Sequence, residues 1–197
     1  MRKLLLLMIC LCVAMICKAQ DTLQNKTYYD KEFNWTIKFP SEFTAVSSED
    51  WAKLKMRGTT AIQNTYKQKV EDNTKTIFVF KSGGPNYFES LYQYIDPKKN
   101  PDRNALNRTV DQILYHTMAS QIPTAKIDST SVRTTIDNLT FDVFIIKMSI
   151  PNSVFSYNMY MFSHMFSNRE FCANIMFLNS QKGDIMLDAF KSSTFGH

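Results

Sequence analysis

Alternating hydrophobic and polar residues predict the first strand. Trp35, Ile37 and Phe39 are separated by single polar residues, which is the period of a strand with one buried face. Two further apolar stretches follow: residues 76–81 are predicted to be a strand, and residues 88–95 a strand or, as the alternative, a helix. The early part of the sequence therefore supplies strands to a sheet.

Helical spacing and capping residues predict four helical stretches. Ser47 with Asp50 three residues later is a capping-box pattern, and Gly58 is expected to close the helix that follows. Thr109 is expected to cap the third stretch, which Pro123 ends. The four stretches cover residues 51–56, 61–70, 110–118 and 181–191.

The second half of the chain alternates apolar segments with turn residues. Four β-type segments cover residues 126–135, 139–150, 154–166 and 170–179. Pairs such as Asp137-Asn138 and Ser167-Asn168 separate them, which predicts an antiparallel meander. The third segment is apolar on both faces, so the sheet needs cover on both sides. We therefore predict an α+β fold, an α/β/α sandwich around a mainly antiparallel sheet.

Two polar segments are predicted to lie outside these elements. Residues 20–33 are polar and are expected to be loose, and residues 96–104 contain two prolines and no apolar side chain. No repeat or change of composition divides the chain, so residues 20–197 are predicted to form one domain.

The start of the sequence has the pattern of a secretory leader. A basic start, Met1-Arg2-Lys3, precedes fourteen apolar residues, Leu4–Cys17, and Cys17-Lys18-Ala19 offers a cleavage site. The apolar run is short for a membrane span, which takes about 20 residues. We interpret residues 1–19 as a signal peptide and expect export to the periplasm or the extracellular space.

Removal of this leader changes the charge and the cysteine count. The 197-residue chain has a formal charge of +5, which falls to about +2 without Arg2, Lys3 and Lys18. Of four cysteines only Cys172 remains, so no intramolecular disulfide is expected. The near-neutral charge argues against a nucleic-acid partner, and no later apolar run predicts a transmembrane segment in the mature chain.

The segment from Phe33 to Phe43, which reads FNWTIKFPSEF, resembles the opening strand of the PsbP-like family. That family includes the extrinsic photosystem subunit PsbP, the Ran-binding Mog protein and the DcrB-type bacterial envelope proteins. The order of later elements is similar as well, and the leader ending Lys18-Ala19-Gln20 looks like those of Bacteroidota envelope proteins. The resemblance implies a PsbP-like sandwich, a role in binding or assembling other proteins, and no shared catalytic motif.

Cys172 and His164 suggest a nucleophilic dyad, because they flank the turn at Ser167-Asn168. With a two-residue loop, however, Cys172 pairs with Ser163 and His164 pairs with Phe171. The two groups then lie on opposite faces of the sheet. We prefer a packing role for Cys172 and predict no catalytic residues.

A group of sulfur and imidazole ligands offers the second candidate. Met159, Met161, His164 and Met165 lie within seven residues, and such ligands suit copper(I). The three methionines share one face and the histidine points to the other, so core packing is the preferred interpretation. The scattered histidines disfavour zinc, and the chain has no glycine-rich phosphate loop. We therefore expect no metal and no cofactor.

Two carboxylates and one aromatic segment stand out in the remaining sequence. Asp142 and Glu170 are the only acids within otherwise apolar strands, and a position at a strand end or rim is the expected reason. A tyrosine-rich strand precedes the polar loop and is the best candidate for a contact surface, although sheet packing is the simpler explanation. The candidate residues are Tyr87, Phe88, Tyr92, Tyr94, Lys98, Lys99 and Arg103.

Three functions remain open from the sequence. The first is a non-enzymatic envelope protein that binds or helps assemble a protein partner. The second is a small-molecule or hydrophobic-ligand binder with a pocket between sheet and helices, which a large cavity would favour. The third is a hydrolase whose site has no recognisable motif.

Overall fold

The computed structural model describes residues 26–69, 71–96, 98 and 102–196. The predicted signal peptide, residues 1–19, and Lys99 of the predicted contact surface lie outside these residues. Within the described part of the chain, no helix is both long and apolar enough to cross a membrane.

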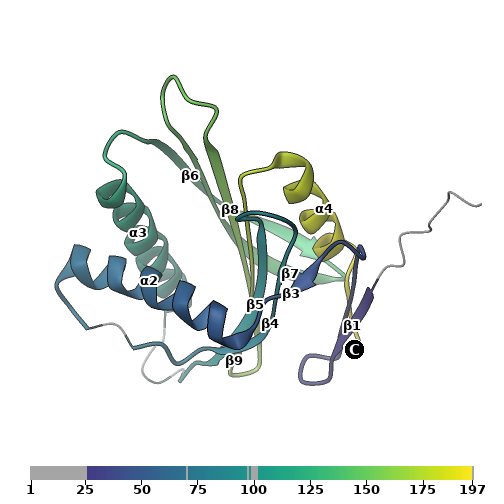
Figure 1. Ribbon diagram of the computed structural model, residues 1–197. Coiled ribbons are helices and arrows are strands. Elements are labelled where there is room, and N and C mark those ends of the chain that lie inside the picture. Colours follow the sequence, from purple (N-terminus) through teal and green to yellow (C-terminus); the bar gives the residue numbers. More distant parts are fainter. Residues whose placement is uncertain (1–25, 70, 97, 99–101, 197) are drawn as a thin grey trace, which may run out of the picture.

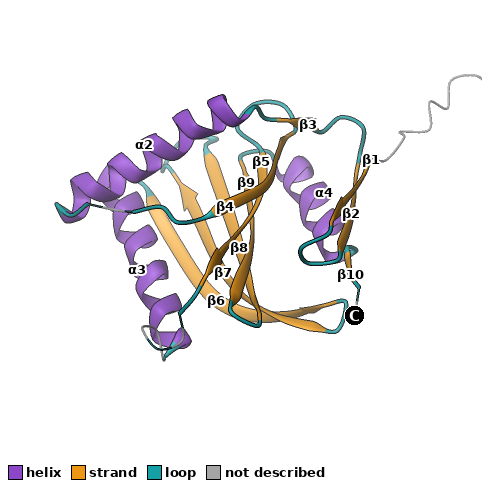
Figure 2. Cartoon of the chain, turned by 90° about the horizontal axis from the view of Figure 1, so that it is seen from below, coloured by secondary structure: helices purple, strands orange, loops and turns teal. Residues whose placement is uncertain are grey.

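Two antiparallel sheets form the framework (Figures 1 and 2). The main sheet has the order β3 (Thr44–Ala45), β4 (Lys75–Lys81), β5 (Tyr87–Tyr94), β9 (Arg169–Phe177), β8 (Ser156–Phe166), β7 (Leu139–Ser149) and β6 (Lys126–Ile136). The small sheet has the order β1 (Lys26–Asp30), β2 (Trp35–Phe39) and β10 (Thr194–Phe195).

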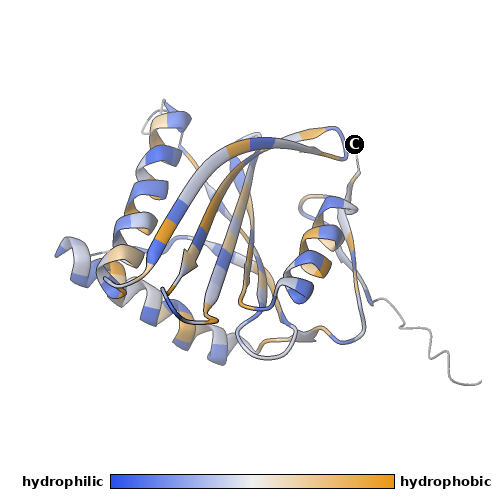
Figure 3. Cartoon of the chain, turned by 90° about the horizontal axis from the view of Figure 1, so that it is seen from above, coloured by the Kyte–Doolittle hydropathy of each residue, from blue (hydrophilic) through white to orange (hydrophobic). Residues whose placement is uncertain are grey.

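Three helices cover the main sheet from both sides. Figure 2 shows α2 (Ser48–Tyr66) and α3 (Arg103–Gln121) on one face, and α4 (Ser180–Lys191) with the small sheet on the other. The predicted α/β/α sandwich around an antiparallel sheet is confirmed. Figure 3 shows hydrophobic residues along the central strands, whereas α2 and α3 are mainly hydrophilic.

The face beneath α4 and the small sheet holds an aromatic core. Trp35 on β2 is fully buried and stacks between Phe78 and Phe195, with ring centroids 5.3 and 5.7 Å away. Its indole N–H donates to the Ser193 hydroxyl over 2.8 Å, so the one polar atom of the ring is satisfied. The predicted alternation of the first strand thus places its apolar residues in this core.

The predicted meander of late strands is also confirmed. β6, β7, β8 and β9 pair in sequence order. Asp137 and Asn138 both have positive φ, at 46° and 64°, as a two-residue turn of the favoured hand requires. Ser167 has φ 59° at the turn between β8 and β9. The turn residues therefore set the pairing register that later decides which side chains meet.

Three local predictions were wrong. Gly58 does not close a helix, because α2 continues through it to Tyr66 and is capped by Lys67, which takes the left-handed conformation with φ 54°. Thr109 is not a cap: the Asp102 side chain accepts from the Ala105 N–H over 2.9 Å and starts α3 earlier. The stretch 20–33 is not entirely loose, because β1 pairs along the whole of β2.

Candidate ligand-binding cavity

The register of the main sheet aligns polar side chains on the face that α2 and α3 cover. Asp142 pairs with Ser163, Ser163 with Cys172, and Cys172 with Leu91. Directly paired residues point to the same face, so these four side chains form one row across four strands. The adjacent row on the same face consists of Phe144, Met161, Asn174 and Glu89.

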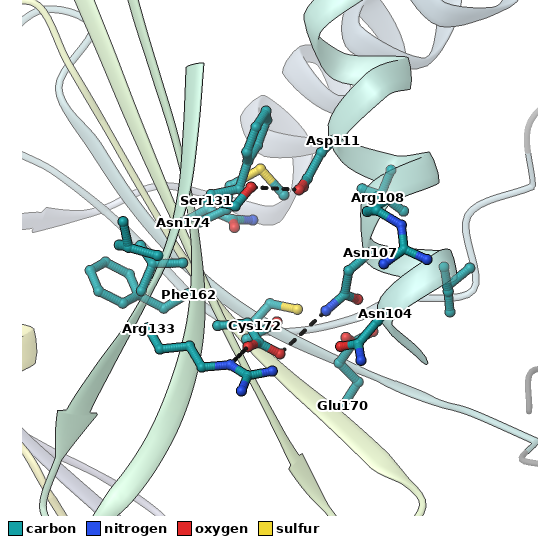
Figure 4. A pocket seen from close by; sticks show the side chains of 18 of the residues that line it. Asn104, Asn107, Arg108, Asp111, Ser131, Arg133, Phe162, Glu170, Cys172 and Asn174 are labelled. Carbon is teal, nitrogen blue, oxygen red and sulfur yellow. Dashed lines mark hydrogen bonds and ion pairs between the residues drawn. The ribbon is translucent and has the colours of Figure 1, made fainter. Parts of the chain in front are cut away.

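A cavity of about 700 Å³ lies between these rows and the first half of α3. Figure 4 shows side chains from the helix and from the strands converging on it. Leu106, Asn107, Val110 and Asp111 of α3 form the helical wall. Such a volume is within the range of sites that enclose small organic molecules.

Arg103, the first residue of α3, ties the helix to the sheet beside one end of the cavity. Its terminal nitrogen lies 3.3 Å from the Ser163 hydroxyl, 3.6 Å from Glu170 and 3.8 Å from Asp142. The Glu170 side chain is only 8% exposed, so its charge needs this partner. The Nε–H of Arg103 is buried and makes no hydrogen bond within the described residues.

The two carboxylates at this end have further partners. Arg133 donates from Nε to Asp142 over 2.9 Å, and Asn107 donates to the other oxygen of Asp142 over 3.5 Å. Gln93 donates to Glu170 over 2.9 Å. Asp142 and Glu170 are therefore held by arginine and amide groups, as carboxylates away from bulk water must be.

A third carboxylate faces the cavity from the helix. Asp111 accepts a hydrogen bond from the Ser131 hydroxyl of β6 over 3.2 Å. Burial, together with the nearby charge of Asp142, raises the pKa of Asp111 above its ordinary value. The charged form of Asp111 is thus less well solvated than that of a surface aspartate.

Behind the cavity wall lies a buried acid, Glu89, which is 6% exposed. It accepts hydrogen bonds from the Trp51 indole of α2 and the Asn174 amide, both over 3.0 Å. Burial raises the pKa of Glu89, although both hydrogen bonds oppose that shift. The Asn174 carbonyl oxygen is buried and has no hydrogen-bond partner among the described residues.

Cys172 lines the cavity on the sheet side and is half-buried. Burial raises the pKa of its thiol, and the charges of Glu170 and Glu89 raise it further. The thiol therefore stays protonated at neutral pH, whereas a nucleophilic cysteine needs the thiolate. The predicted pairing is confirmed: Cys172 lies opposite Ser163, and His164 lies opposite Phe171 on the other face.

The copper candidates are separated by the sheet. The register places Met159, Met161 and Met165 on the helix-covered face. His164 is on the aromatic face, where its ring packs on Phe141 with the ring centroids 5.2 Å apart. Its Nδ1 lies 2.7 Å from the Thr140 carbonyl oxygen. In the described ranges, no three His, Cys, Asp or Glu side chains are grouped to hold a metal ion.

The predicted contact surface does not form as a unit. Phe88 is fully buried in the aromatic core, because its face of β5 lies under the small sheet. Tyr87 points to the opposite face of the sheet and packs on Trp51, with the ring centroids 5.8 Å apart. Arg103 is directed toward the sheet carboxylates rather than outward, since it begins α3 instead of ending the loop.

Only part of that predicted surface remains together. Tyr92 and Tyr94 lie edge to face at 5.9 Å, and Tyr94 is 54% exposed. The Lys75 ammonium lies over both rings, 5.7 and 5.1 Å from their centroids. Lys98 is exposed. This reduced set is a small aromatic patch at the edge of the core.

Comparison with known proteins is informative only at the level of the fold. No family model and no curated protein sequence matches the chain. The solution structure of cyanobacterial PsbP (CyanoP) from Synechocystis sp. PCC 6803 superposes with a TM-score of 0.54. The alignment covers 90% of this chain and 96% of CyanoP at 7% sequence identity. The fold is PsbP-like.

Sequence reasoning singled out four residues that line the cavity, Asp142, Glu170, Cys172 and Met161, but assigned none of them to it. Asp142 and Glu170 stood out as acids in apolar strands, but we expected a strand end or rim. In the structure both line the cavity, and Glu170 is buried. Asp111, Ser131 and Asn174 gave no signal, because each is an ordinary polar residue until the register brings it to this face.

Proposed function

We propose that this chain is an exported, non-catalytic binding protein that encloses a small organic molecule between α3 and the main sheet. The observation that carries the proposal is the cavity of about 700 Å³ with its polar side chains from both walls. Apolar walls with a few convergent polar groups are typical of ligand sites. Export is part of the proposal and rests on the leader-like pattern of residues 1–19.

The chemistry of the cavity supports binding over catalysis. Its thiol, Cys172, has a raised pKa and faces no imidazole, because His164 points to the other side of the sheet. Asp142 and Glu170 accept hydrogen bonds from, or form ion pairs with, arginine and amide groups. These contacts fix the positions of the two carboxylates. The Ser131 hydroxyl donates to Asp111 over 3.2 Å, but the described residues that line the cavity include no histidine or lysine to serve as its general base.

A protein partner is the second candidate, and one observation favours it. Tyr94 is more than half exposed beside Tyr92 and Lys75, and aromatic and cationic groups are enriched at protein interfaces. The patch is small, however, and Phe88, Tyr87 and Arg103 no longer belong to it. We therefore place the enclosed ligand first.

A fragment screen read by two-dimensional amide NMR tests the proposal. The library should hold neutral, cationic and anionic fragments in equal numbers. We expect hits to shift amide signals of residues around the cavity, such as Leu106, Ser163 and Asn174. Hits that map elsewhere, or a library without hits, would show that the cavity is not a binding site.

A matched pair of tryptophan variants sharpens this test. Leu106→Trp places a bulky ring on the helical wall of the cavity, whereas Val154→Trp places the same ring at a fully exposed position. We expect Leu106→Trp to abolish the cavity hits and Val154→Trp to leave them unchanged. Equal binding to both variants would contradict the proposed site.

A further inference from the structure

The carboxylates of the cavity differ in how their charge is balanced. Asp142 forms an ion pair with Arg133 at 2.9 Å, and Glu170 forms one with Arg103 at 3.6 Å. Asp111 forms none with any lysine, arginine or histidine of the described residues. Its hydrogen-bond donor is the neutral hydroxyl of Ser131.

The cation nearest to Asp111 along the helix points to another acid. Arg108 is 66% exposed at its side chain and lies 3.9 Å from Asp102, at the start of α3. Arg108 also lines the cavity, but its ion pair is with Asp102, and it forms none with Asp111. Asp111 is therefore the one cavity-lining carboxylate in the described chain whose charge the protein leaves unpaired.

The surroundings of Asp111 contain a buried acceptor that has no donor among the described residues. Figure 4 shows Asp111 and Ser131 at the same end of the cavity as Asn174. The Asn174 carbonyl oxygen has no donor among the described residues, and the amide of the same side chain is occupied by Glu89. Leu91, Phe144 and Met161 supply apolar surface beside these acceptors.

We propose that the ligand of the cavity carries a positively charged amine, which pairs with Asp111, while its apolar body packs on Phe144 and Met161. This inference rests on the proposed function and specifies the class of ligand. An ammonium group carries a positive charge and several donors but no acceptor, so it matches the Asp111 carboxylate, whose only donor among the described residues is the neutral Ser131 hydroxyl. A carboxylate ligand would meet repulsion from Asp111 at the same place.

The raised pKa of Asp111 agrees with this assignment. The carboxylate is partly removed from water and feels Asp142, and both effects disfavour its charged form in the empty cavity. A bound ammonium group supplies the missing opposite charge. A charge-assisted hydrogen bond of this type is stronger than a neutral one.

Three probes that share a phenyl ring on a four-carbon chain test the charge preference: phenylbutylamine, phenylbutanol and phenylbutyrate. Their affinities are measured by amide NMR titration of the full mature chain. We expect the amine to bind about tenfold more tightly than the alcohol, since a hydrogen bond to a charged group contributes enough for that ratio. Phenylbutyrate should bind more weakly than either.

Two substitutions locate the origin of the preference. Asp111→Asn retains the shape and removes the charge, so the amine should lose its advantage over the alcohol while the alcohol binds as before. Asp184→Asn changes an exposed aspartate on α4, across the sheet, and should leave the amine preference intact.

The outcomes separate this inference from the proposed function. Equal cavity binding by all three probes, tighter binding of phenylbutyrate, or an amine preference that survives Asp111→Asn would overturn the amine assignment and leave the cavity as a binding site. Absence of binding by every probe would also overturn it, and the fragment screen would then decide whether the cavity binds other ligands.

Discussion

The two faces of the main sheet are covered by different means. On the face under α4, five helix residues are buried, and aromatic rings from both sheets interlock around Trp35. On the opposite face α2 has no buried residue among those described, and α3 has Thr117 alone. The face under α4 therefore holds the larger hydrophobic core, and the other face combines a smaller apolar cluster with polar groups and a cavity.

This contrast shows how one sheet can serve two purposes. Side chains alternate between faces along each strand, so the same segment of β9 sends Phe171, Ala173 and Ile175 into the core and Cys172 and Asn174 into the cavity wall. Burial of aromatic surface on one side offsets the cost of polar groups on the other. The predictions below measure the difference between the faces.

The two tryptophans of the chain give the largest expected difference, because one lies on each face. Trp35→Ala removes a fully buried ring and should lower the free energy of unfolding by about 3–5 kcal/mol. Trp51→Ala removes a partly exposed ring and its hydrogen bond to Glu89, and should cost less than about 2 kcal/mol. Urea denaturation followed by far-UV circular dichroism measures both. Equal losses would mean that α2 is as firmly packed as the aromatic core.

Two glycines should respond in opposite directions. A Cβ atom at Gly183 in α4 would collide with the Phe177 ring, so Gly183→Ala should destabilise the protein by about 1–3 kcal/mol. A Cβ atom at Gly58 in α2 meets nothing within 4 Å, so Gly58→Ala should stabilise it by about 0.5–1 kcal/mol. Thermal unfolding of the two variants gives the sign directly. A loss of stability in Gly58→Ala would reveal close packing that the helix-covered face does not show.

The buried acid on the helix-covered face predicts a dependence of stability on pH. The folded-state pKa of Glu89 is raised, so the folded protein binds more protons than the unfolded chain between the two pKa values. Stability therefore falls as pH rises through that window, and Glu89→Gln should remove the fall. We expect the variant to gain about 1 kcal/mol near neutral pH and close to nothing near pH 4.

An exposed aspartate serves as a control for whether the burial of Glu89 causes the pH dependence of stability. Asp188→Asn changes an exposed residue of α4 and should leave the pH profile of stability unchanged. Both variants are followed by urea denaturation at several pH values. If Glu89→Gln follows the same profile as the parent chain, the desolvation of Glu89 is not a cost to the fold.

Much of the fold could be predicted from local patterns. The alternation at Trp35–Phe39 and the turn residues at Asp137-Asn138 and Ser167 act over a few residues, and their effects survive in the tertiary structure. The helix boundaries were harder, because Asp102 and Thr109 are both good caps and the sequence does not show which one is used. In the structure Asp102 is the N-cap of α3, because its carboxylate accepts a hydrogen bond from the Ala105 N–H.

The cavity could not be predicted in the same way. Its walls combine residues from six elements, and their alignment depends on the register of β5, β9, β8, β7 and β6. Asp142 and Glu170 were noticeable as acids in apolar strands, yet nothing local indicates that Arg103 approaches both. Asp111 has the spacing of an ordinary surface residue of a helix. Only the tertiary structure shows that it faces the cavity without a cationic partner among the described residues.

The smallest expected effect lies at the rim of the aromatic face. Tyr94 is 54% exposed and contacts Tyr92 and Lys75, so Tyr94→Ala should lower the free energy of unfolding by about 0.5 kcal/mol, the value of an exposed cation–π contact. Val154→Ala, at a fully exposed site, supplies the baseline. A loss well above that value would make Tyr94 part of the core, whereas a loss near the baseline would leave its exposed ring without a structural reason and strengthen the case for a protein partner at this patch.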